Sequence, residues 1–325
     1  MTRRGPAWGN RQRGDLRITA RTAKGEAMHE QIERFLSNQG RRWSPSTLRQ
    51  YAWYLEDLGR WLEASSPPRG SEPASVTVDA LDAWLAARQH WAPSTQYLAI
   101  VACRMFFRWA LGVRRSPADD VVMPRRLTKP QRALTELRLQ QLLASLDTSS
   151  AKGVRDLSLI TLLVDTGLRA AEVTSLQVGH VNVNDRTFTA RIKGGTWADG
   201  VFGSYTGACL VDWLGTRRDY VRPTVQEVYI GLGGLTPGCR MTVCGLRAMF
   251  RELGCKVGFP LSTHDFRRTF ATLSLKAGAP TRLVQVAGHW KDLSMVERYS
   301  RSLTPADFER YSPVNALMGI RPPPD

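Results

Sequence analysis

The stretch THDFRRTF at residues 263–270 decides how the second half of this 325-residue chain is interpreted. On a helix, His264 and Arg267 are three residues apart and project from one face. Phe266 and Phe270 are four apart and can anchor the opposite face in a core. The pattern predicts an amphipathic helix whose polar face carries a histidine beside an arginine. Such a face suits a phosphate group, and it is also compatible with ordinary solvated surface.

Length and charge narrow the class of protein. A chain of 325 residues exceeds a typical domain of ~100–200 residues, which favours two domains. The net charge of +16 and the pI of about 10.3 predict a polyanionic partner, nucleic acid before membrane. Only seven of the 45 basic residues are lysine. Arginine is the better bidentate phosphate ligand, although a GC-rich coding sequence would produce the same bias.

Cysteine usage and hydropathy argue against a zinc site and against a membrane protein. The five cysteines contain no C-x-x-C pair, and Cys239 and Cys244 have no histidine close by. The longest apolar stretch, at residues 157–164, is too short to cross a bilayer. The basic N-terminus lacks the apolar segment of a secretory signal. We therefore expect reduced thiols and a soluble, cytoplasmic protein without a bound metal.

The N-terminal part of the chain is predicted to be a basic arm followed by a helical domain. Residues 1–25 carry seven Arg or Lys against one Asp, which indicates a disordered arm along DNA or, alternatively, a solubilising tail. Residues 26–112 show helical periodicity, with similar P-S-T helix starts at 45–47 and 93–95. Six arginines are expected on exposed helix faces, as DNA contacts or as solvated charge: Arg41, Arg42, Arg49, Arg88, Arg104 and Arg108.

A linker is predicted at residues 113–133, where three prolines and two arginine pairs occur without periodicity. The second domain, residues 134–325, is predicted to be mostly helical. It is interrupted by a β-prone segment at 181–192 and a weaker strand at 201–205. From about residue 302 we expect a C-terminal tail with a short helix.

Polar residues recur in the second domain where a helical core does not require them. Arg169, in DTGLRAAEV, follows a glycine typical of a helix end and is expected to open the next helix, where an anion can bind. Lys193, in IKGG, lies where a strand meets a turn. His289 follows a glycine, and Tyr299 lies ten residues later. Taken singly, each residue is equally consistent with surface charge or with packing.

Taken in order, the motifs TGLRAAE, IKGG, HDFRRTFAT, GH and ERY resemble those of the tyrosine recombinases, the phage integrase family of site-specific recombinases. The resemblance covers the chain from about residue 26 to its end. It implies a mainly α fold in which a helical, SAM-like core-binding domain precedes a mostly helical catalytic domain. That second domain would have the DNA breaking–rejoining fold, with a small antiparallel β-sheet.

The resemblance also implies how the reaction is divided among the residues. Tyr299 would attack a DNA phosphodiester, leaving a 3′-phosphotyrosyl enzyme and a free 5′-hydroxyl. Arg169 and Arg267 would hold the two non-bridging oxygens, and His289 would donate a further hydrogen bond there.

Proton transfer would fall to the remaining two residues. His264 would help to move the tyrosine proton, and Lys193 would protonate the departing 5′ oxygen. Because these cations supply positive charge, no metal or other cofactor is expected. One departure is that the segment between His289 and Tyr299 is about one residue longer than in the family, within WKDLS. Tyr311 therefore stays open as an alternative nucleophile.

These observations predict a site-specific DNA recombinase or integrase of a phage or other mobile element. By resemblance it would act as a homotetramer on two duplexes that carry a specific site. An accessory DNA-bending or directionality factor is compatible with this role, and the tail would dock on a neighbouring protomer. Two alternatives stay open: a type IB topoisomerase, which uses a similar residue set, and a sequence-specific DNA-binding protein without catalysis.

Overall fold

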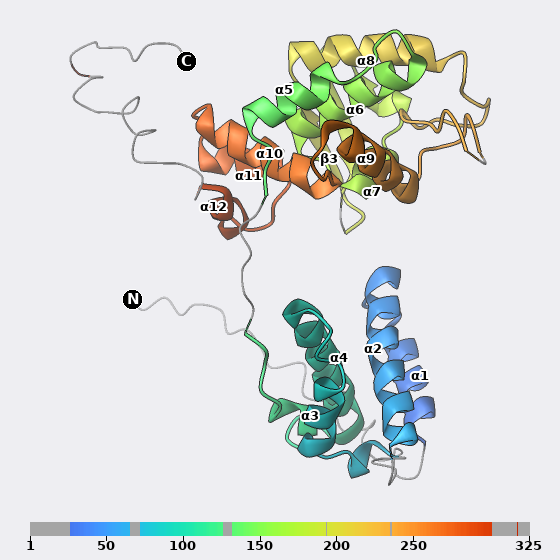
Figure 1. The fold of residues 1–325 in the computed structure, drawn as a ribbon, viewed down its shortest axis with the longest axis vertical. Coiled ribbons are helices and arrows are strands. Elements are labelled where there is room, and N and C mark those ends of the chain that lie inside the picture. The colour runs from blue at the N-terminus through green and yellow to red at the C-terminus, as the bar shows by residue number, and fades with distance from the viewer. Residues whose placement is uncertain are drawn as a thin grey trace, which may run out of the picture. The chain divides into compact units, whose positions relative to one another are not determined.

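The chain forms two compact units, with the division between Lys129 and Pro130 (Figure 1). Each unit of the computed structural model has its own hydrophobic core. The predicted basic arm, Lys193, Tyr311 and nearly all of the predicted tail lie outside the residues that the structure describes. The described residues are 27–65, 72–125, 132–192, 194–234, 236–300 and 317.

The N-terminal unit is helical and contains α1 (Met28–Gln39), α2 (Pro45–Ala64), α3 (Val78–Ala86) and α4 (Pro93–Leu111). Ser44 caps α2 by accepting a hydrogen bond from the Thr47 amide, and Pro93 occupies the first turn of α4. The two helix starts predicted from P-S-T are therefore confirmed. The apolar faces meet in an aromatic core that includes Phe35, Trp84, Phe106 and Phe107.

Two of the six arginines expected on exposed faces are paired inside this unit. Arg88 donates from Nε to Oδ2 of Asp57 at 2.9 Å, and Arg108 binds Asp119 at 2.9 Å. Because their charge is already matched by a carboxylate, these two side chains are less suited to DNA contact than the sequence indicated.

Arg104 is also bound internally, and its partners correct the predicted linker. Its guanidinium donates to the main-chain carbonyls of Ala118, Asp119 and Val121 at 2.8, 3.2 and 3.0 Å. The side chains of Ala118 and Val121 are buried in the N-terminal core. The first part of the segment at 113–133 is therefore packed onto the helical unit. Pro117 begins a short 3-10 turn at Pro117–Asp119 rather than free chain.

The C-terminal unit is built around α6, which packs against both α8 and α10. The LSLITLLV stretch forms the centre of α6, where Leu159, Ile160, Leu162 and Leu163 are fully buried. A helix that is apolar on nearly every side requires neighbours on nearly every side. The helices of this unit are α5 (Glu136–Ala144), α6 (Ala151–Thr166), α7 (Ala170–Thr174), α8 (Ser204–Arg217), α9 (Val243–Val257), α10 (Thr263–Lys276), α11 (Thr281–Ala287) and α12 (Ser294–Ser300).

A small antiparallel sheet of order β1-β2-β3 lies in the same unit. Its strands are β1 (Val181–Asn182), β2 (Thr187–Arg191) and β3 (Trp197–Val201). The β-prone segment at 181–192 is not one strand, because Asn182 Oδ1 accepts the amides of Asn184 and Asp185 and turns the chain. The mainly α fold with a small antiparallel sheet is confirmed.

The strand predicted at 201–205 is wrong. Residues 197–201 pair with β2 instead, with Arg191 opposite Trp197 and Thr187 opposite Val201. The chain then enters α8 at Ser204, since Oδ2 of Asp165 accepts hydrogen bonds from the Gly203 amide and the Thr206 hydroxyl. A carboxylate on α6 thus starts a helix where local propensity favoured a strand, and short-range sequence does not reveal that contact.

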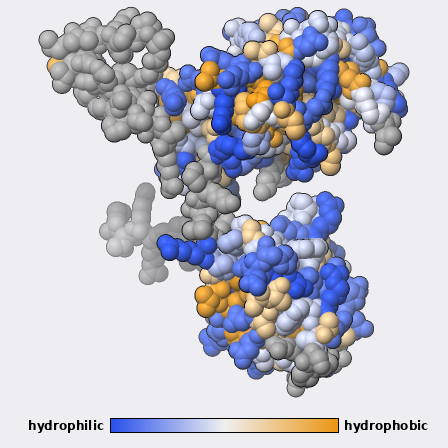
Figure 2. Space-filling model, in the orientation of Figure 1, coloured by the Kyte–Doolittle hydropathy of each residue, from blue (hydrophilic) through white to orange (hydrophobic). Residues whose placement is uncertain are grey.

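Hydrophilic residues cover much of the visible face of each unit, with small hydrophobic patches between them (Figure 2). Within the described part of the chain, none of the helices combines the length and the apolar character that a membrane span requires.

Candidate active site

The first turn of α10 is fixed by a buried carboxylate. Oδ2 of Asp265 accepts hydrogen bonds from the amide and the hydroxyl of Ser262, at 2.9 and 2.8 Å. Asp265 is almost fully buried and also binds Arg132 Nη2 at 3.1 Å. His264 and Arg267 project from this anchored turn, as the three-residue spacing predicted.

The guanidinium of Arg267 is buried and held on two edges and one face. Nη1 donates to the carbonyl of Gly167 at 2.5 Å, and Nη2 donates to the carbonyl of Gly288 at 2.6 Å. The Trp290 ring lies against the guanidinium, with Cζ 4.0 Å from its centroid. Each terminal nitrogen carries a second N–H, so this geometry leaves donors with which a phosphate can be bound bidentately.

Both carbonyls belong to glycines, because the neighbouring aromatic rings leave no room for a side chain at either position. A Cβ on Gly167, whose φ is 61°, would lie 2.6 Å from the Phe270 ring. A Cβ on Gly288 would lie 1.9 Å from the Trp290 ring. A side chain on Gly288 would displace the Trp290 ring that lies against the Arg267 guanidinium, and one on Gly167 would displace the Phe270 ring that stacks on Trp290. These glycines therefore allow the close approach of backbone, rings and cation.

Arg169 lies two residues beyond Gly167 and is fixed by Glu172. The buried carboxylate accepts from the Arg169 amide at 2.9 Å and from its Nη1 at 2.8 Å. In the sequence, Glu172 stands three residues after Arg169 within TGLRAAE, and this spacing was the available signal for the contact. Burial lowers the pKa of Arg267 to about 10, and the charge of Arg169 adds to this effect. Two cations thus converge where an anion would relieve their repulsion.

His264 lies on the exposed side of this cluster. Partial burial lowers the pKa of its imidazole below the ordinary value of 6.5, and the charges of Arg268 and Arg267 lower it further. His264 is therefore neutral at pH 7, the form that can accept a proton.

His289 connects the end of α11 to strand β3. It has a φ of 52°, a left-handed conformation that is uncommon outside glycine. Nε2 lies 3.2 Å from the main-chain carbonyl of Asp199, and Nδ1 is buried without a hydrogen-bond partner among the described residues. Position 193 lies between β2 and β3, where the amide of Ile192 donates to the carbonyl of Thr196. Lys193 itself lies outside the described residues.

Tyr299, on α12, packs into the same cluster. Its ring is 6% exposed, and its centroid is 5.7 Å from that of Trp290. The interaction of its phenol with Arg267 raises the pKa of that guanidinium, against the larger effect of burial. The Trp290 ring packs against that of Tyr299, and its only sequence signal was its place directly after His289.

The structure thus brings together Arg169, His264, Arg267, His289 and Tyr299 from four helices and their ends. Among the described residues there is no group of three or more His, Cys, Asp or Glu placed to hold a metal ion.

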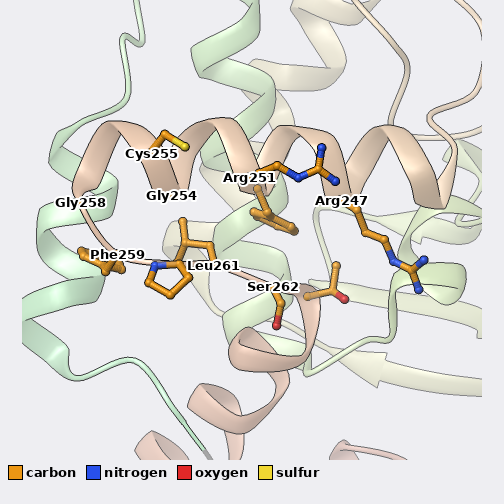
Figure 3. A pocket seen from close by; sticks show the side chains of 11 residues that line it. Arg247, Arg251, Gly254, Cys255, Gly258, Phe259, Leu261 and Ser262 are labelled. Atoms are coloured by element: carbon orange, nitrogen blue, oxygen red, sulfur yellow. The ribbon is translucent and has the colours of Figure 1, made fainter. Parts of the chain in front are cut away.

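An open pocket of about 550 Å³ lies beside this cluster, between α9 and the start of α10. Phe259 lies at one end of the pocket and Arg247 at the other, with Ser262 below α9 (Figure 3). Arg247 and Arg251 are exposed, and neither has an ion-pair partner in the described part of the chain. Two unmatched cations therefore border the helix that carries His264 and Arg267.

The chain matches the model of the phage integrase family over residues 132–304. It is 30% identical to tyrosine recombinase XerC of Rhodospirillum centenum, across 79% of this chain and 77% of that protein. It is 28% identical to tyrosine recombinase XerC of Chromohalobacter salexigens, across 92% of this chain and 99% of that protein.

Two solved structures have a similar fold at low sequence identity. The Tn1549 transposon integrase in complex with circular intermediate DNA has a TM-score of 0.68 at 19% identity, covering 90% of this chain and 99% of that one. The XerH site-specific recombinase bound to difH substrate has a TM-score of 0.64 at 18% identity, covering 86% and 84%.

Proposed function

Because this chain belongs to the phage integrase family of tyrosine recombinases, we propose that the cluster around Arg267 cuts and rejoins DNA through a 3′-phosphotyrosyl intermediate. The observation that carries the proposal is the guanidinium of Arg267, buried between two glycine carbonyls with a second arginine facing it. A buried cation beside a like charge is costly to maintain for stability alone, and it suits a site where an anion binds.

In this proposal the two arginines bind the scissile phosphate. Arg267 presents its remaining terminal N–H donors from a rigid position, and Arg169 is oriented by Glu172. Both guanidiniums stabilise the negative charge that increases on the non-bridging oxygens in the transition state. His289 adds a donor from the end of α11. Because the donors are already oriented before DNA binds, little reorganisation is required during the reaction.

The nucleophile is the Tyr299 hydroxyl. Its oxygen forms a bond to phosphorus as the bond to the 5′ oxygen breaks. A free phenol has a pKa of about 10, so attack at neutral pH requires a proton acceptor. The lowered pKa of His264 makes its neutral imidazole available for this role. Lys193 would protonate the departing 5′ oxygen, and a second strand's hydroxyl can later reverse the reaction.

The same proposal specifies the DNA that the protein binds and the assembly in which it acts. We propose double-stranded DNA with a specific recombination site, bound by the N-terminal unit as a core-binding domain and by the C-terminal unit as the catalytic domain. The excess of positive charge supports DNA as the partner. The assembly would be a homotetramer on two duplexes in the cytoplasm, with the tail beyond residue 302 docked on a neighbouring protomer. The source would be a phage or another mobile element.

A nicked suicide substrate that carries the authentic core site tests the chemistry. Incubation without added metal should trap a covalent protein–DNA adduct, detected as a shifted band after denaturing electrophoresis. Tyr299→Phe should abolish the adduct and retain site binding, because it removes only the nucleophilic oxygen. The matched control, Tyr311→Phe, should retain the adduct.

Three outcomes would contradict the proposal in different ways. An adduct that survives Tyr299→Phe and disappears with Tyr311→Phe would transfer the nucleophile to Tyr311. Relaxation of any supercoiled plasmid, without a specific site, would favour a type IB topoisomerase. Site binding without an adduct from the unmodified protein would favour a DNA-binding protein that lacks catalysis.

A further inference from the structure

We propose that Trp290 is a positioning residue of this site, whose indole fixes the plane of the Arg267 guanidinium and supports the ring of Tyr299. The inference rests on the proposed function of the site. It goes beyond that function because Trp290 has no part in the chemistry itself and contacts two residues that do.

The geometry at Arg267 shows what the indole contributes. The two carbonyls of Gly167 and Gly288 hold the guanidinium at two points. Two such points leave the plane free to rock about the line that joins them. The Trp290 ring, 4.0 Å from Cζ, restricts that rotation. The direction of the remaining N–H donors, and therefore of a bound phosphate, depends on this plane.

The same ring reaches the nucleophile. The Trp290 centroid is 5.7 Å from that of Tyr299 and 6.0 Å from that of Phe270, to which it is nearly parallel. All three rings are buried in one small cluster with Val284 and Val296. Trp290 therefore contacts both the cation proposed to bind phosphate and the tyrosine proposed to attack it.

The main chain at Trp290 is anchored independently of these contacts. The side-chain amide of Gln285, which is buried, donates to the carbonyls of Trp290 and Lys291 at 3.1 and 3.2 Å. The Trp290 amide donates to the Gln285 carbonyl at 3.0 Å, and Arg282 donates to Gln285 Oε1 at 2.6 Å. Because buried Gln285 hydrogen-bonds to the two carbonyls that follow His289, the main chain that carries the indole is held in place.

Three variants separate positioning from simple packing. Trp290→Leu removes the aromatic face, Trp290→Phe keeps a smaller one, and Val284→Ala removes buried volume from the same cluster while leaving the indole in place. Each is assayed for single-turnover adduct formation at saturating DNA, for the Kd of the core site, and for Tm. We expect Trp290→Leu to slow cleavage by ~10- to 100-fold, since small misplacements of reacting groups have effects of this size. Its Kd should stay within about 3-fold of the parent protein.

The controls decide the interpretation. Trp290→Phe should recover a substantial part of the rate, and Val284→Ala should lower Tm with less than about a 3-fold loss of rate. Equal rate losses for Trp290→Leu and Val284→Ala at matched Tm would overturn the positioning role and leave the proposed function intact. A parent protein that binds its site without forming an adduct would instead refute the proposed function.

A double variant tests whether the effect passes through the arginine. Lysine has no planar face, so Arg267→Lys removes the feature that Trp290 orients. In that background, Trp290→Leu should cost much less than the ~10- to 100-fold expected in the parent. An undiminished loss would mean that Trp290 does not act through Arg267, and it would overturn the proposed orientation of the guanidinium by the indole.

Discussion

Arg104 in the N-terminal unit and Arg267 in the C-terminal unit both donate guanidinium hydrogen bonds to main-chain carbonyls. The acceptors of Arg104 all lie in one short segment, and Asp119 lies 3.9 Å from its Nε. The acceptors of Arg267 lie on two segments far apart in the sequence. The charge of Arg169 lowers the pKa of Arg267, and Glu172, whose charge acts in the opposite direction, is bound to Arg169.

The difference teaches how a structural arginine can be distinguished from a functional one. Arg104 has a carboxylate within 3.9 Å, that of Asp119, which it shares with Arg108, and it uses its donors to fix the chain after α4. Arg267 is more deeply buried, has a like charge beside it, and keeps donors directed into the site. A cation whose pKa is lowered and whose charge is poorly compensated destabilises the fold, and such groups are concentrated at functional sites. The contrast predicts that removing each side chain will affect different properties.

The largest effect is expected for Arg267→Ala. It should slow adduct formation by ~10²-fold or more, by analogy with the loss of an oxyanion donor, and leave DNA binding nearly unchanged. The matched control is Arg268→Ala, because Arg268 is adjacent but points toward Asp265. Cleavage rates at saturating DNA and Kd values measure both. Equal losses at the two positions would show that the basic cluster acts only as a binding surface.

Arg104→Ala should show the opposite pattern. Loss of its hydrogen bonds should destabilise the N-terminal unit by about 2 kcal/mol, since charged donors to buried carbonyls contribute ~1.5–3 kcal/mol. Calorimetry of the full chain would report this as a lower transition temperature. Cleavage at saturating DNA, measured well below that transition, should be unaffected. A loss of cleavage rate as large as that of Arg267→Ala would contradict the assignment of a purely structural role to Arg104.

Arg247→Ala extends the comparison to an exposed cation beside the pocket. We expect it to weaken DNA binding several-fold and to reduce the slope of log K against log salt by ~0.9, because one phosphate contact is lost. The cleavage rate at saturating DNA should not change. Titrations at several salt concentrations measure the slope, and Lys152→Ala, which removes a lysine paired with Glu252, is the control. An unchanged slope would place Arg247 outside the DNA contact surface.

The smallest effect is a pH dependence of stability. The native pKa of His264 lies below its unfolded value of about 6.5, so the unfolded chain binds a proton that the native protein does not. The free energy of unfolding should therefore decrease as the pH falls below about 6.5, until the native pKa is reached. His264→Gln should make this decrease shallower in denaturant titrations between pH 7 and 5. Identical pH profiles would show that neither burial nor the neighbouring arginines lower the pKa of this imidazole.

Much of the architecture was predictable from local pattern. The helices with P-S-T starts and the amphipathic α10 follow from periodicity and capping, which neighbouring residues determine. The strand predicted at 201–205 was wrong because a carboxylate on α6 starts α8 there, and the segment at 113–133 was only partly a linker because Arg104 binds its carbonyls.

By itself, the sequence determined which residue types the site could contain and their order along the chain, because each of Arg169, His264, Arg267, His289 and Tyr299 stands in a short motif of neighbouring residues. Only the tertiary structure decided how they are held. The carbonyls of Gly167 and Gly288 meet one guanidinium although they lie 121 residues apart, and Trp290 packs under it through contacts that leave no periodic signal. A backbone carbonyl belongs to every residue, so its use as a ligand depends on where the folded chain places it and not on which side chain it carries.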